Sequence, residues 1–329
     1  MATIYDVAER AAVSIATVSA VINRSSYVSP ELTKRVNQAI REMDYTINQV
    51  AHALQTRRTN TIGMLIPDTG APDPFYGQVV RGAEDVLGKK GYLLFLGHTY
   101  NSVDEQTRYL SAFRARLVDG VLLFQAPGED KELERLIDTK KPLVFVGRVP
   151  KDIAGDIVAI DIQAGTRMGI EHLLKNGHTR IGMLLVSASM SVQAYRIAGW
   201  RAALRKCGLT PDESYVISGE LSTEAGACGA AELLELPEPP TAIFTDNLVL
   251  LTGVLKILKE RGIGCPGEME LASSDDAEFL DVFQPPVTTV VQPSYELGAQ
   301  AAELLLQRIR YPKRAFKKAI LKPRLCVRA

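Results

Sequence analysis

The sequence predicts an α/β protein: an N-terminal three-helix helix-turn-helix headpiece, then a two-lobed core of doubly wound parallel sheets. Two short amphipathic helical segments, joined by a tight break, lie within the first 25 residues. From residue 61, short apolar segments alternate with helical ones in two series, as expected for parallel sheets covered on both faces. The 329 residues, 46% hydrophobic and 23% charged, fit a soluble globular protein of more than one domain.

Residues 4–23 predict the first two helices. Their expected buried positions are Val7, Ala8 and Ala11 in the first helix and Val18, Val21 and Ile22 in the second. The break at Ala12 and Val13 is followed by Ser14, a favourable N-cap. Such a pair is typical of a helix-turn-helix, whose second helix enters the major groove of DNA. The alternative is an ordinary helical hairpin. The small or polar, acid-free opposite face favours DNA: Ile15, Ala16, Ser19, Ala20 and Asn23.

A third helix and a linker complete the N-terminal region. Ser29 and Pro30 are a helix-start signal, and an apolar stripe follows at Val36, Ala39, Ile40 and Met43. We therefore expect the headpiece over residues 1–46. Residues 47–59 are weakly helical without a broad apolar face, and so short a helix is marginal in isolation. They are interpreted as a hinge helix or, alternatively, as a plain linker.

The remaining chain predicts two lobes. The first series of apolar runs covers residues 62–67, 92–97, 120–124 and 142–146, with helical stretches such as 77–89 and 104–116 between them. The second series covers residues 157–161, 180–186, 241–245 and 270–273. A last apolar run at residues 287–292 is followed by one more helix.

Several motifs resemble the LacI/GalR family of bacterial repressors. The N-terminal ones are Tyr5-Asp6-Val7-Ala8, Val13-Ser14, Thr17-Val18-Ser19 and Val21-Ile22-Asn23. Others lie at residues 72–76, 116–121, 177–181, 196–200 and 285–290. Two positions depart from the family pattern: Ala12 replaces the turn glycine, which predicts slight strain, and Ala20 replaces a basic or histidine reader of the bases.

The resemblance implies a periplasmic-binding-protein-like clamshell over residues 60–329. Its first lobe would comprise about residues 60–160 plus 292–321, and its second lobe about 161–291 plus 322–329. It also implies a homodimer on a pseudo-palindromic operator. The hinge helix would order on that operator and wedge Leu54 into the minor groove. The chain ends without the heptad helix of tetrameric members, which favours a dimer.

The DNA contacts expected from residue type and family position fall into three groups. Ile15 and Ala16 suit thymine methyl groups, and Ser19 and Asn23 can hydrogen-bond to phosphate or a base edge. The third group, Tyr5, Ser14 and Thr17, is expected to contact phosphates. Without an arginine reader on the helix, the hinge should carry a larger share of specificity. The full candidate set is Tyr5, Ser14, Ile15, Ala16, Thr17, Ser19, Ala20, Asn23, Tyr27, Ser29, Asn48 and Leu54.

A clamshell binds small molecules between its lobes, at the carboxyl ends of the strands. Arginine and carboxylate side chains there suit the hydroxyl groups of a sugar or sugar derivative. Phe75 or Tyr76 would stack on a ring. Arg148 either serves an acidic sugar or forms a surface salt bridge. Asp246 and Asn247 reverse the usual family order. The candidate set is Phe75, Tyr76, Arg148, Asp161, Met190, Arg196, Asp246 and Asp275.

Composition excludes several other classes. Lys plus Arg and Asp plus Glu both number 38, so a basic DNA-binding surface has to be local. Four cysteines without a C-x-x-C pair indicate neither a zinc site nor a disulfide framework. We expect no metal and no cofactor. No leader and no apolar run of membrane length is present, so we expect a cytoplasmic protein without a membrane partner.

The basic C-terminal tail after residue 303 has two interpretations, a second nucleic-acid surface or a solvated rim, and the sequence favours the rim. An enzyme is disfavoured. The G-x-G-x-x-G match at residues 262–267 follows a helix instead of opening one, and the histidines are scattered. A periplasmic sugar-binding protein is the alternative, but it would not explain the helix-turn-helix. The sequence therefore predicts an effector-controlled transcriptional regulator, a repressor.

Overall fold

The computed structural model describes residues 2–23, 26–45, 58–67, 74–126, 128, 131–138, 141–148, 153–187 and 191–328. The chain divides into two compact units, Met1–Thr59 and Asn60–Ala329. Each unit is described on its own below. Within the described ranges, no helix combines the length and the apolar character needed to span a bilayer.

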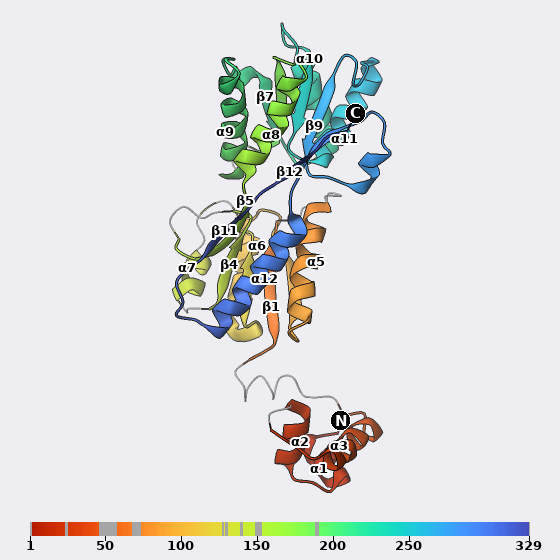
Figure 1. The fold of residues 1–329 in the computed structure, drawn as a ribbon. Helices are drawn as coiled ribbons and strands as arrows, with labels where there is room; N and C mark the ends of the chain where they lie inside the picture. Colours follow the sequence, from red (N-terminus) through yellow and green to blue (C-terminus); the bar gives the residue numbers. More distant parts are fainter. Residues whose placement is uncertain are drawn as a thin grey trace. The chain divides into compact units, whose positions relative to one another are not determined.

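In the described part of the first unit lie the helices α1 (Ile4–Ala11), α2 (Ile15–Asn23) and α3 (Pro30–Glu42) (Figure 1). Thr3 and Asp6 form a capping box that starts α1, in which the Thr3 backbone N–H donates to Asp6 Oδ2 at 2.7 Å. Ala12 ends the helix in the left-handed region, with φ +48°, where an alanine is strained. Arg35 closes this turn by donating to the Ala11 carbonyl oxygen at 2.6 Å.

The headpiece core lies where the three helices meet. Its buried residues are Val7, Ala8, Ala11, Val18, Val36 and Ala39, with Val21, Ile22, Ile40 and Met43 packed against them. One expectation is wrong: Ala20 is only 9% exposed, although it was placed on the DNA-facing side. The reason is that α2 packs against both α1 and α3, which covers a wider stripe of its surface than one partner would.

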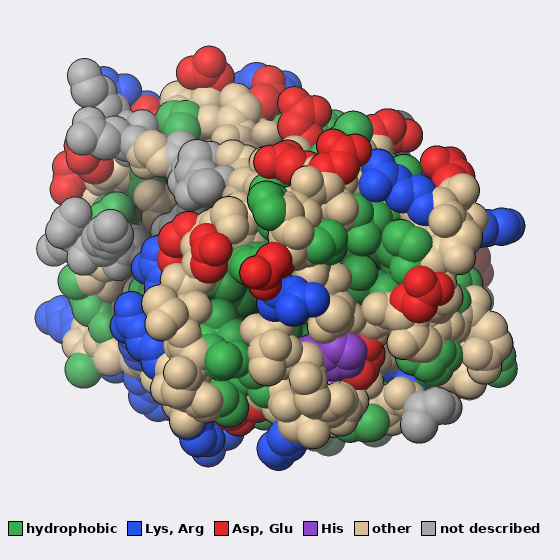
Figure 2. All heavy atoms as spheres, turned by 90° about the horizontal axis from the view of Figure 1, so that it is seen from above, with side chains coloured by type: hydrophobic (Ala, Val, Ile, Leu, Met, Phe, Trp, Pro, Cys, Tyr) green, Lys and Arg blue, Asp and Glu red, His purple; other side chains and the backbone are tan. Residues whose placement is uncertain are grey.

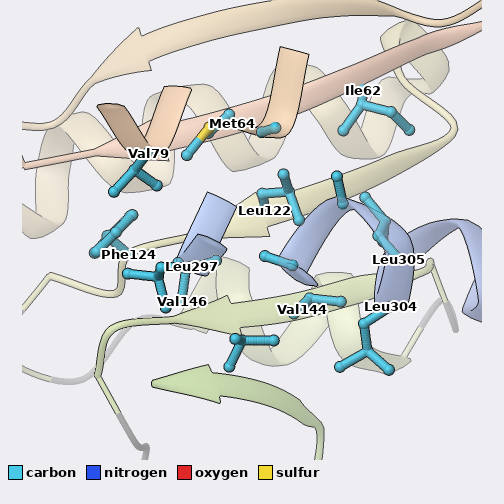
Figure 3. Packing of buried hydrophobic residues seen from close by; sticks show 14 of the residues in the cluster. Ile62, Met64, Val79, Leu122, Phe124, Val144, Val146, Leu297, Leu304 and Leu305 are labelled. Atoms are coloured by element: carbon cyan, nitrogen blue, oxygen red, sulfur yellow. The ribbon is translucent and has the colours of Figure 1, made fainter. Parts of the chain in front are cut away.

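The first lobe of the core is a six-stranded parallel sheet in the order β11-β5-β4-β3-β1-β2. Its strands are β1 (Thr61–Ile66), β2 (Leu93–His98), β3 (Gly120–Leu123), β4 (Leu143–Val146), β5 (Asp156–Ile160) and β11 (Lys318–Leu321). Helices α5 (Pro74–Gly88) and α12 (Ser294–Arg310) pack on one face, around the apolar cluster drawn in Figure 3. The other face is covered by α6 (Val103–Ala112), the π-helical turn Phe113–Leu117 and α7 (Lys131–Asp138).

The second lobe repeats this plan in the order β12-β10-β9-β8-β6-β7. Its strands are β6 (Ile181–Val186), β7 (Val216–Gly219), β8 (Ala242–Thr245), β9 (Glu270–Ser274), β10 (Thr288–Val291) and β12 (Arg324–Cys326), the last antiparallel to β10. Helices α8 (Ile162–Lys175) and α9 (Ser191–Lys206) cover one face, and α10 (Thr223–Leu234) and α11 (Leu248–Arg261) the other. Short 3-10 turns lie at Glu213–Tyr215 and Glu278–Asp281.

The described chain passes between the lobes at residue 161, at residues 292–293 and at residues 322–323. The predicted α/β class with two doubly wound lobes is confirmed. The apolar run at residues 157–161 stands in the second series, whereas the family resemblance places residues up to 160 in the first lobe; β5 pairs with β4 in the first sheet. The chain therefore leaves the first lobe one strand later than the alternation of segments indicated.

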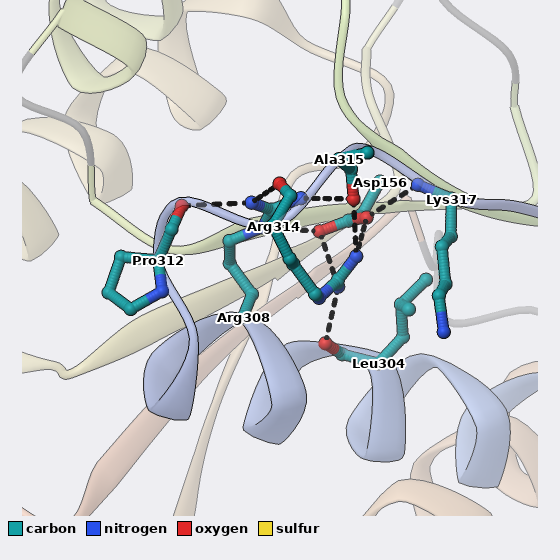
Figure 4. A network of polar contacts seen from close by, with 7 residues as sticks. All are labelled: Asp156, Leu304, Arg308, Pro312, Arg314, Ala315 and Lys317. Atoms are coloured by element: carbon teal, nitrogen blue, oxygen red, sulfur yellow. Dashed lines mark hydrogen bonds and ion pairs between the residues drawn. The ribbon is translucent and has the colours of Figure 1, made fainter.

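Part of the basic C-terminal tail is buried, which corrects the expectation of a solvated rim. Asp156 on β5 accepts hydrogen bonds from Arg308 Nε at 2.7 Å, Arg314 Nη2 at 2.8 Å and the Lys317 backbone N–H at 2.9 Å (Figure 4). Burial alone would raise the pKa of Asp156, but these donors outweigh it and hold the pKa below its usual value. The network anchors the end of α12 and the following loop to the first sheet.

The surface of the second lobe mixes side chains of both charges. Seen from above, hydrophobic side chains lie among acidic, basic and polar ones, with a histidine beside acidic groups (Figure 2). His178 Nε2 lies 2.7 Å from Glu270 Oε2, and His172 Nε2 lies 3.4 Å from the other oxygen.

Gly262 ends α11 in the left-handed region, with φ +67°, so the G-x-G-x-x-G match is a helix stop.

Candidate functional sites: the surface of α2 and the pocket between the lobes

The start of α2 presents a small, acid-free surface. Ser14 caps the helix by accepting from the Thr17 backbone N–H at 3.1 Å, and its hydroxyl lies 2.9 Å from Thr17 Oγ1. Ser14 and Ala16 are exposed, Ile15 is 41% exposed, and Thr17 and Ser19 are half-buried. A helix N-terminus with exposed small and hydroxyl side chains fits the floor of a major groove and offers hydrogen bonds to phosphates.

The remaining DNA-binding candidates are spread around the headpiece. Tyr5 and Tyr27 are 68% and 90% exposed, unusual values for aromatic side chains, which fits surface contacts. Ser29 accepts from the Leu32 backbone N–H at 3.4 Å and so caps α3, which ties its oxygen to the fold. The side chain of Asn23, and Asn48 and Leu54 with the hinge segment, lie outside the described residues.

A pocket lies between the two lobes of the core, at the carboxyl ends of the strands. It encloses about 850 Å³ of space, part of it open to solvent. Residues from both lobes line it, among them six of the eight predicted effector-binding residues: Phe75, Tyr76, Arg148, Arg196, Asp246 and Asp275. Its position follows from the topology, because successive parallel strands end at the same edge of each sheet.

The second-lobe wall of the pocket is a connected polar network. Asp246, directly after β8, has one carboxylate oxygen 2.6 Å from Arg196 Nε. Its other oxygen accepts from Gln193 Nε2 at 2.8 Å and from the Val186 backbone N–H at 3.0 Å. Arg196 Nη1 in turn donates to Ser274 Oγ at 2.8 Å. The charges of Arg196 and Asp246 therefore neutralise each other within the protein.

The order of Asp246 and Asn247 has a physical reason in this network. Asn247 caps α11, where its side-chain oxygen accepts from the backbone N–H groups of Val249 and Leu250 at 3.0 Å each. Asp246 is thereby left to pair with Arg196. Asp275 follows β9 with φ +66°, and its Oδ1 accepts from Gln292 Nε2 at 2.6 Å.

The first-lobe wall is aromatic with one buried cation. Tyr76 lies edge-on to Phe75 and Phe124, with ring centroids 5.2 and 5.5 Å apart. Arg148 is only 8% exposed. Its guanidinium donates to the Gln125 carbonyl oxygen and to Asn101 Oδ1, the latter at 2.6 Å. Burial lowers the pKa of Arg148 from its ordinary value. The surface salt bridge considered from the sequence is therefore wrong.

Asp161 does not line this pocket. Its Oδ1 accepts from the Ala164 backbone N–H at 2.9 Å and caps α8, and Asp161 lines a small neighbouring cavity together with Arg196 and Gln292. Met190 lies outside the described residues. The sequence analysis missed Gln193, which helical spacing places one turn before Arg196, and Gln292, which directly follows β10. Among the described residues, no group of three or more His, Cys, Asp or Glu side chains is arranged to hold a metal.

Two family models match the sequence. The model for bacterial regulatory proteins of the lacI family matches residues 3–48, and the periplasmic binding protein-like domain matches residues 170–329. The ribose operon repressor of Escherichia coli (strain K12) is 33% identical over 314 residues, which cover 95% of this chain and 94% of that protein.

Solved structures resemble the whole chain. A complex of the transcriptional regulator CelR with cellobiose has a TM-score of 0.76 at 30% identity and covers 100% of this chain and 99% of its own. The lac repressor dimer bound to operator and the anti-inducer ONPF has a TM-score of 0.86 at 26% identity and covers 99% and 98%.

Proposed function

We propose a mode of action from a premise that its relatives establish: this chain belongs to the lacI family of bacterial regulatory proteins. It is a DNA-binding transcriptional repressor of the kind that a sugar or metabolite effector controls. The finer proposal is that a homodimer binds a pseudo-palindromic operator through α2. A carbohydrate-like ligand in the pocket between the lobes then changes operator affinity.

One observation carries this proposal. The same chain combines a helix-turn-helix unit with a pocket whose polar groups come from two separate lobes. A ligand that contacts both lobes stabilises one arrangement of them over others. Ligand and operator then bias the same two-state dimer, and each changes the affinity of the other by the same factor.

Two apolar surfaces support the homodimer. β2 is an edge strand of the first sheet and exposes Leu93 at 72% and Phe95 at 50%. In the second lobe, Phe279 and Val282 are 55% and 85% exposed. Apolar side chains on an open sheet edge favour pairing with another chain. We propose a second copy as the occupant, in keeping with the lac repressor structure, which is a dimer.

Selection of binding sites from randomised duplex DNA tests DNA recognition. The expected result is an inverted repeat bound by the purified full chain. Ala16→Asp, which adds an acid to the exposed start of α2, should abolish selection, because it repels phosphates without filling any core space. Ala194→Asp adds the same charge to an exposed position of α9 and should leave selection intact. A site without internal symmetry would contradict the dimeric operator.

Sedimentation tests the dimer surface. Leu93→Arg on β2 should shift the chain toward a monomer at micromolar concentration, since it places a charge in the proposed apolar contact. Ile320→Arg is the matched control, because Ile320 is 44% exposed on β11, at the opposite edge of the same sheet. Equal sedimentation of both variants and the unaltered chain would contradict this surface.

Leu54 and the hinge segment enter the proposal from family position alone. A leucine wedged into the minor groove unstacks a base step and makes the operator centre part of the recognition. Leu54→Ala should therefore weaken operator binding and flatten the sequence preference at the centre of the selected sites. An unchanged sequence preference at the centre of the selected sites would show that Leu54 does not act as a wedge.

A further inference from the structure

We infer that the ligand of the pocket is an anion: a polyhydroxylated molecule that carries a carboxylate or phosphate monoester. Its acidic group would face Arg148 on the first-lobe wall, and its hydroxyl groups would face the network of the second lobe. This inference rests on the proposed function, because it takes the pocket between the lobes to be the effector site. It goes further by assigning the charge and the orientation of the ligand.

The first step is the uncompensated charge of Arg148. Its side chain lines the pocket and is 8% exposed, and its acceptors among the described residues are the neutral oxygens of Gln125 and Asn101. No carboxylate among the described residues forms an ion pair with it. These contacts use two of the five N–H donors of the guanidinium. A buried charge without a counter-ion is costly, and an anionic ligand would remove that cost.

The second step is the contrast with Arg196. That guanidinium already has its counter-ion, since its Nε lies 2.6 Å from Asp246 Oδ1. Although this contact is an ion pair, its angle is too poor for an aligned hydrogen bond. Because Asp246 already neutralises Arg196 and Asp275 adds a second carboxylate, the described part of the second-lobe wall does not attract an acidic group. The acidic end of a ligand is thereby directed to the other wall.

The third step concerns hydroxyl groups. Gln193 lines the pocket and is 2% exposed, and its Oε1 has no hydrogen-bond partner among the described residues. A buried acceptor without a donor is rare in folded proteins, and each one needs an explanation. A ligand hydroxyl supplies that donor. Carboxylate oxygens of Asp246 and Asp275 on the same wall also accept from hydroxyl groups.

The geometry of the Arg148 fork favours an oxyanion over a single hydroxyl. A carboxylate or phosphate accepts two parallel N–H bonds from a guanidinium, and such charge-assisted bonds are about twice as strong as neutral ones. The edge-to-face rings of Phe75, Tyr76 and Phe124 beside it provide an apolar surface for the C–H face of a polyol.

Calorimetry of the full chain tests this inference with matched probes. The carboxylates are D-gluconate and D-glucuronate, the phosphate monoester is D-glucose 6-phosphate, and the neutral counterparts are sorbitol and D-glucose. We expect at least one anion to bind, and its neutral counterpart to bind at least about 30-fold more weakly. Binding of the carboxylates alone, or of the phosphate alone, identifies which oxyanion the site takes, and either result supports the inference.

Variants of Arg148 locate the effect. Arg148→Gln should weaken binding of the anion by about 30-fold and leave the neutral counterpart unchanged. Arg148→Lys keeps the charge but loses the fork, so a smaller loss is expected. Arg201→Gln is the control, because Arg201 pairs with Glu213 at 2.7 Å on the exposed side of α9 and lies outside the pocket lining. It should not change the affinity.

Three results would overturn the inference. They are neutral compounds that bind as tightly as the anions, no binding by any anion of the panel, and an anion whose affinity Arg148→Gln leaves unchanged. None of these results contradicts the proposed DNA binding, which is tested separately by operator selection with the ligand-free chain. Failure of that selection with intact anion binding would remove the DNA-binding proposal and keep the anion site.

Discussion

Arg308 and Arg148 are buried to nearly the same extent, 7% and 8% exposed, but their surroundings differ. Arg308 donates to Asp156 at 2.7 Å and to the carbonyl oxygens of Pro312, Arg314 and Ala315 (Figure 4). Its charge is paired, and four of its five N–H donors are used. Among the described residues, Arg148 has two neutral acceptors and no carboxylate partner, and it lines a pocket.

The difference separates a structural arginine from a candidate binding arginine. A saturated ion pair contributes to the fold, because removing one partner leaves the other charge buried alone. An unsaturated cation weakens the empty fold slightly and gains its partner only when a ligand arrives. Burial alone does not distinguish these roles, and the count of satisfied donors does. The following predictions test that contrast, from the largest expected effect to the smallest.

Arg308→Gln should lower the free energy of unfolding by about 3 kcal/mol, because it leaves the fully buried Asp156 with Arg314 as its remaining cation. Urea unfolding followed by circular dichroism measures this. Arg201→Gln, which removes an exposed ion pair, should change stability by less than about 0.5 kcal/mol. Equal losses of unfolding free energy in both variants would show that the buried ion pair of Arg308 contributes no more to stability than the exposed pair of Arg201.

Acid should weaken the same network. Burial would raise the pKa of Asp156, but donors led by Arg308 hold it below the ordinary value of 3.8. The group therefore contributes stability above its unfolded-state pKa and loses it as the pH falls through the lower folded-state pKa. Between neutral pH and pH near 4, little change is expected from this residue. In more acidic solution, the unaltered chain should lose more stability than Asp156→Asn does. Parallel pH profiles would contradict the assignment.

Gly298→Ala tests how much the packing of α12 against α5 contributes to stability, apart from the ion pair between Arg308 and Asp156. A Cβ at Gly298 would lie 1.8 Å from the Val79 carbonyl oxygen on α5, so the two helices would have to move apart. We expect a loss of about 2 kcal/mol in the same urea experiment. Gly77→Ala on α5 is the control, because a Cβ there meets nothing within 4 Å, and it should stabilise by about 0.5–1 kcal/mol.

Arg148→Gln should change the stability of the ligand-free protein least, by less than about 1 kcal/mol, because the lost hydrogen bonds are offset by the removal of an unpaired buried charge. Its effect should be seen in ligand binding instead. A loss comparable to that of Arg308→Gln would make Arg148 a structural residue and end the contrast.

The sequence predicted the architecture well where periodicity is strong. Alternating apolar and amphipathic segments were sufficient for two doubly wound lobes, since parallel strands buried on both faces are continuous apolar runs. β11 and β12 were not predicted. Both are short, and β11 alternates exposed and half-buried residues, so neither produces such a run. The apolar pattern does not determine the order of the strands in a sheet. For this reason it placed the β5 segment in the second series.

The candidate pocket was predictable to the extent that position at a strand end identifies it. Arg196 and Asp246 were found in this way, and helical spacing from Arg196 would have found Gln193. The rule is less direct at Asp161, which caps α8 and lines only a small neighbouring cavity, because an aspartate before a helix is also a favourable N-cap. Whether a charged side chain has a partner depends on contacts between distant segments. The opposite states of Arg308 and Arg148 therefore appear only in three dimensions.

The central claim is that a ligand in the pocket controls DNA binding. Fluorescence anisotropy of the selected operator, titrated with the chain at saturating and at zero concentration of the anion found by calorimetry, tests it most directly. We expect the operator affinity to change by at least about fivefold, in either direction. Arg148→Gln at the same anion concentration should show a smaller change. Identical operator affinities for the fully occupied and the empty protein would contradict the account.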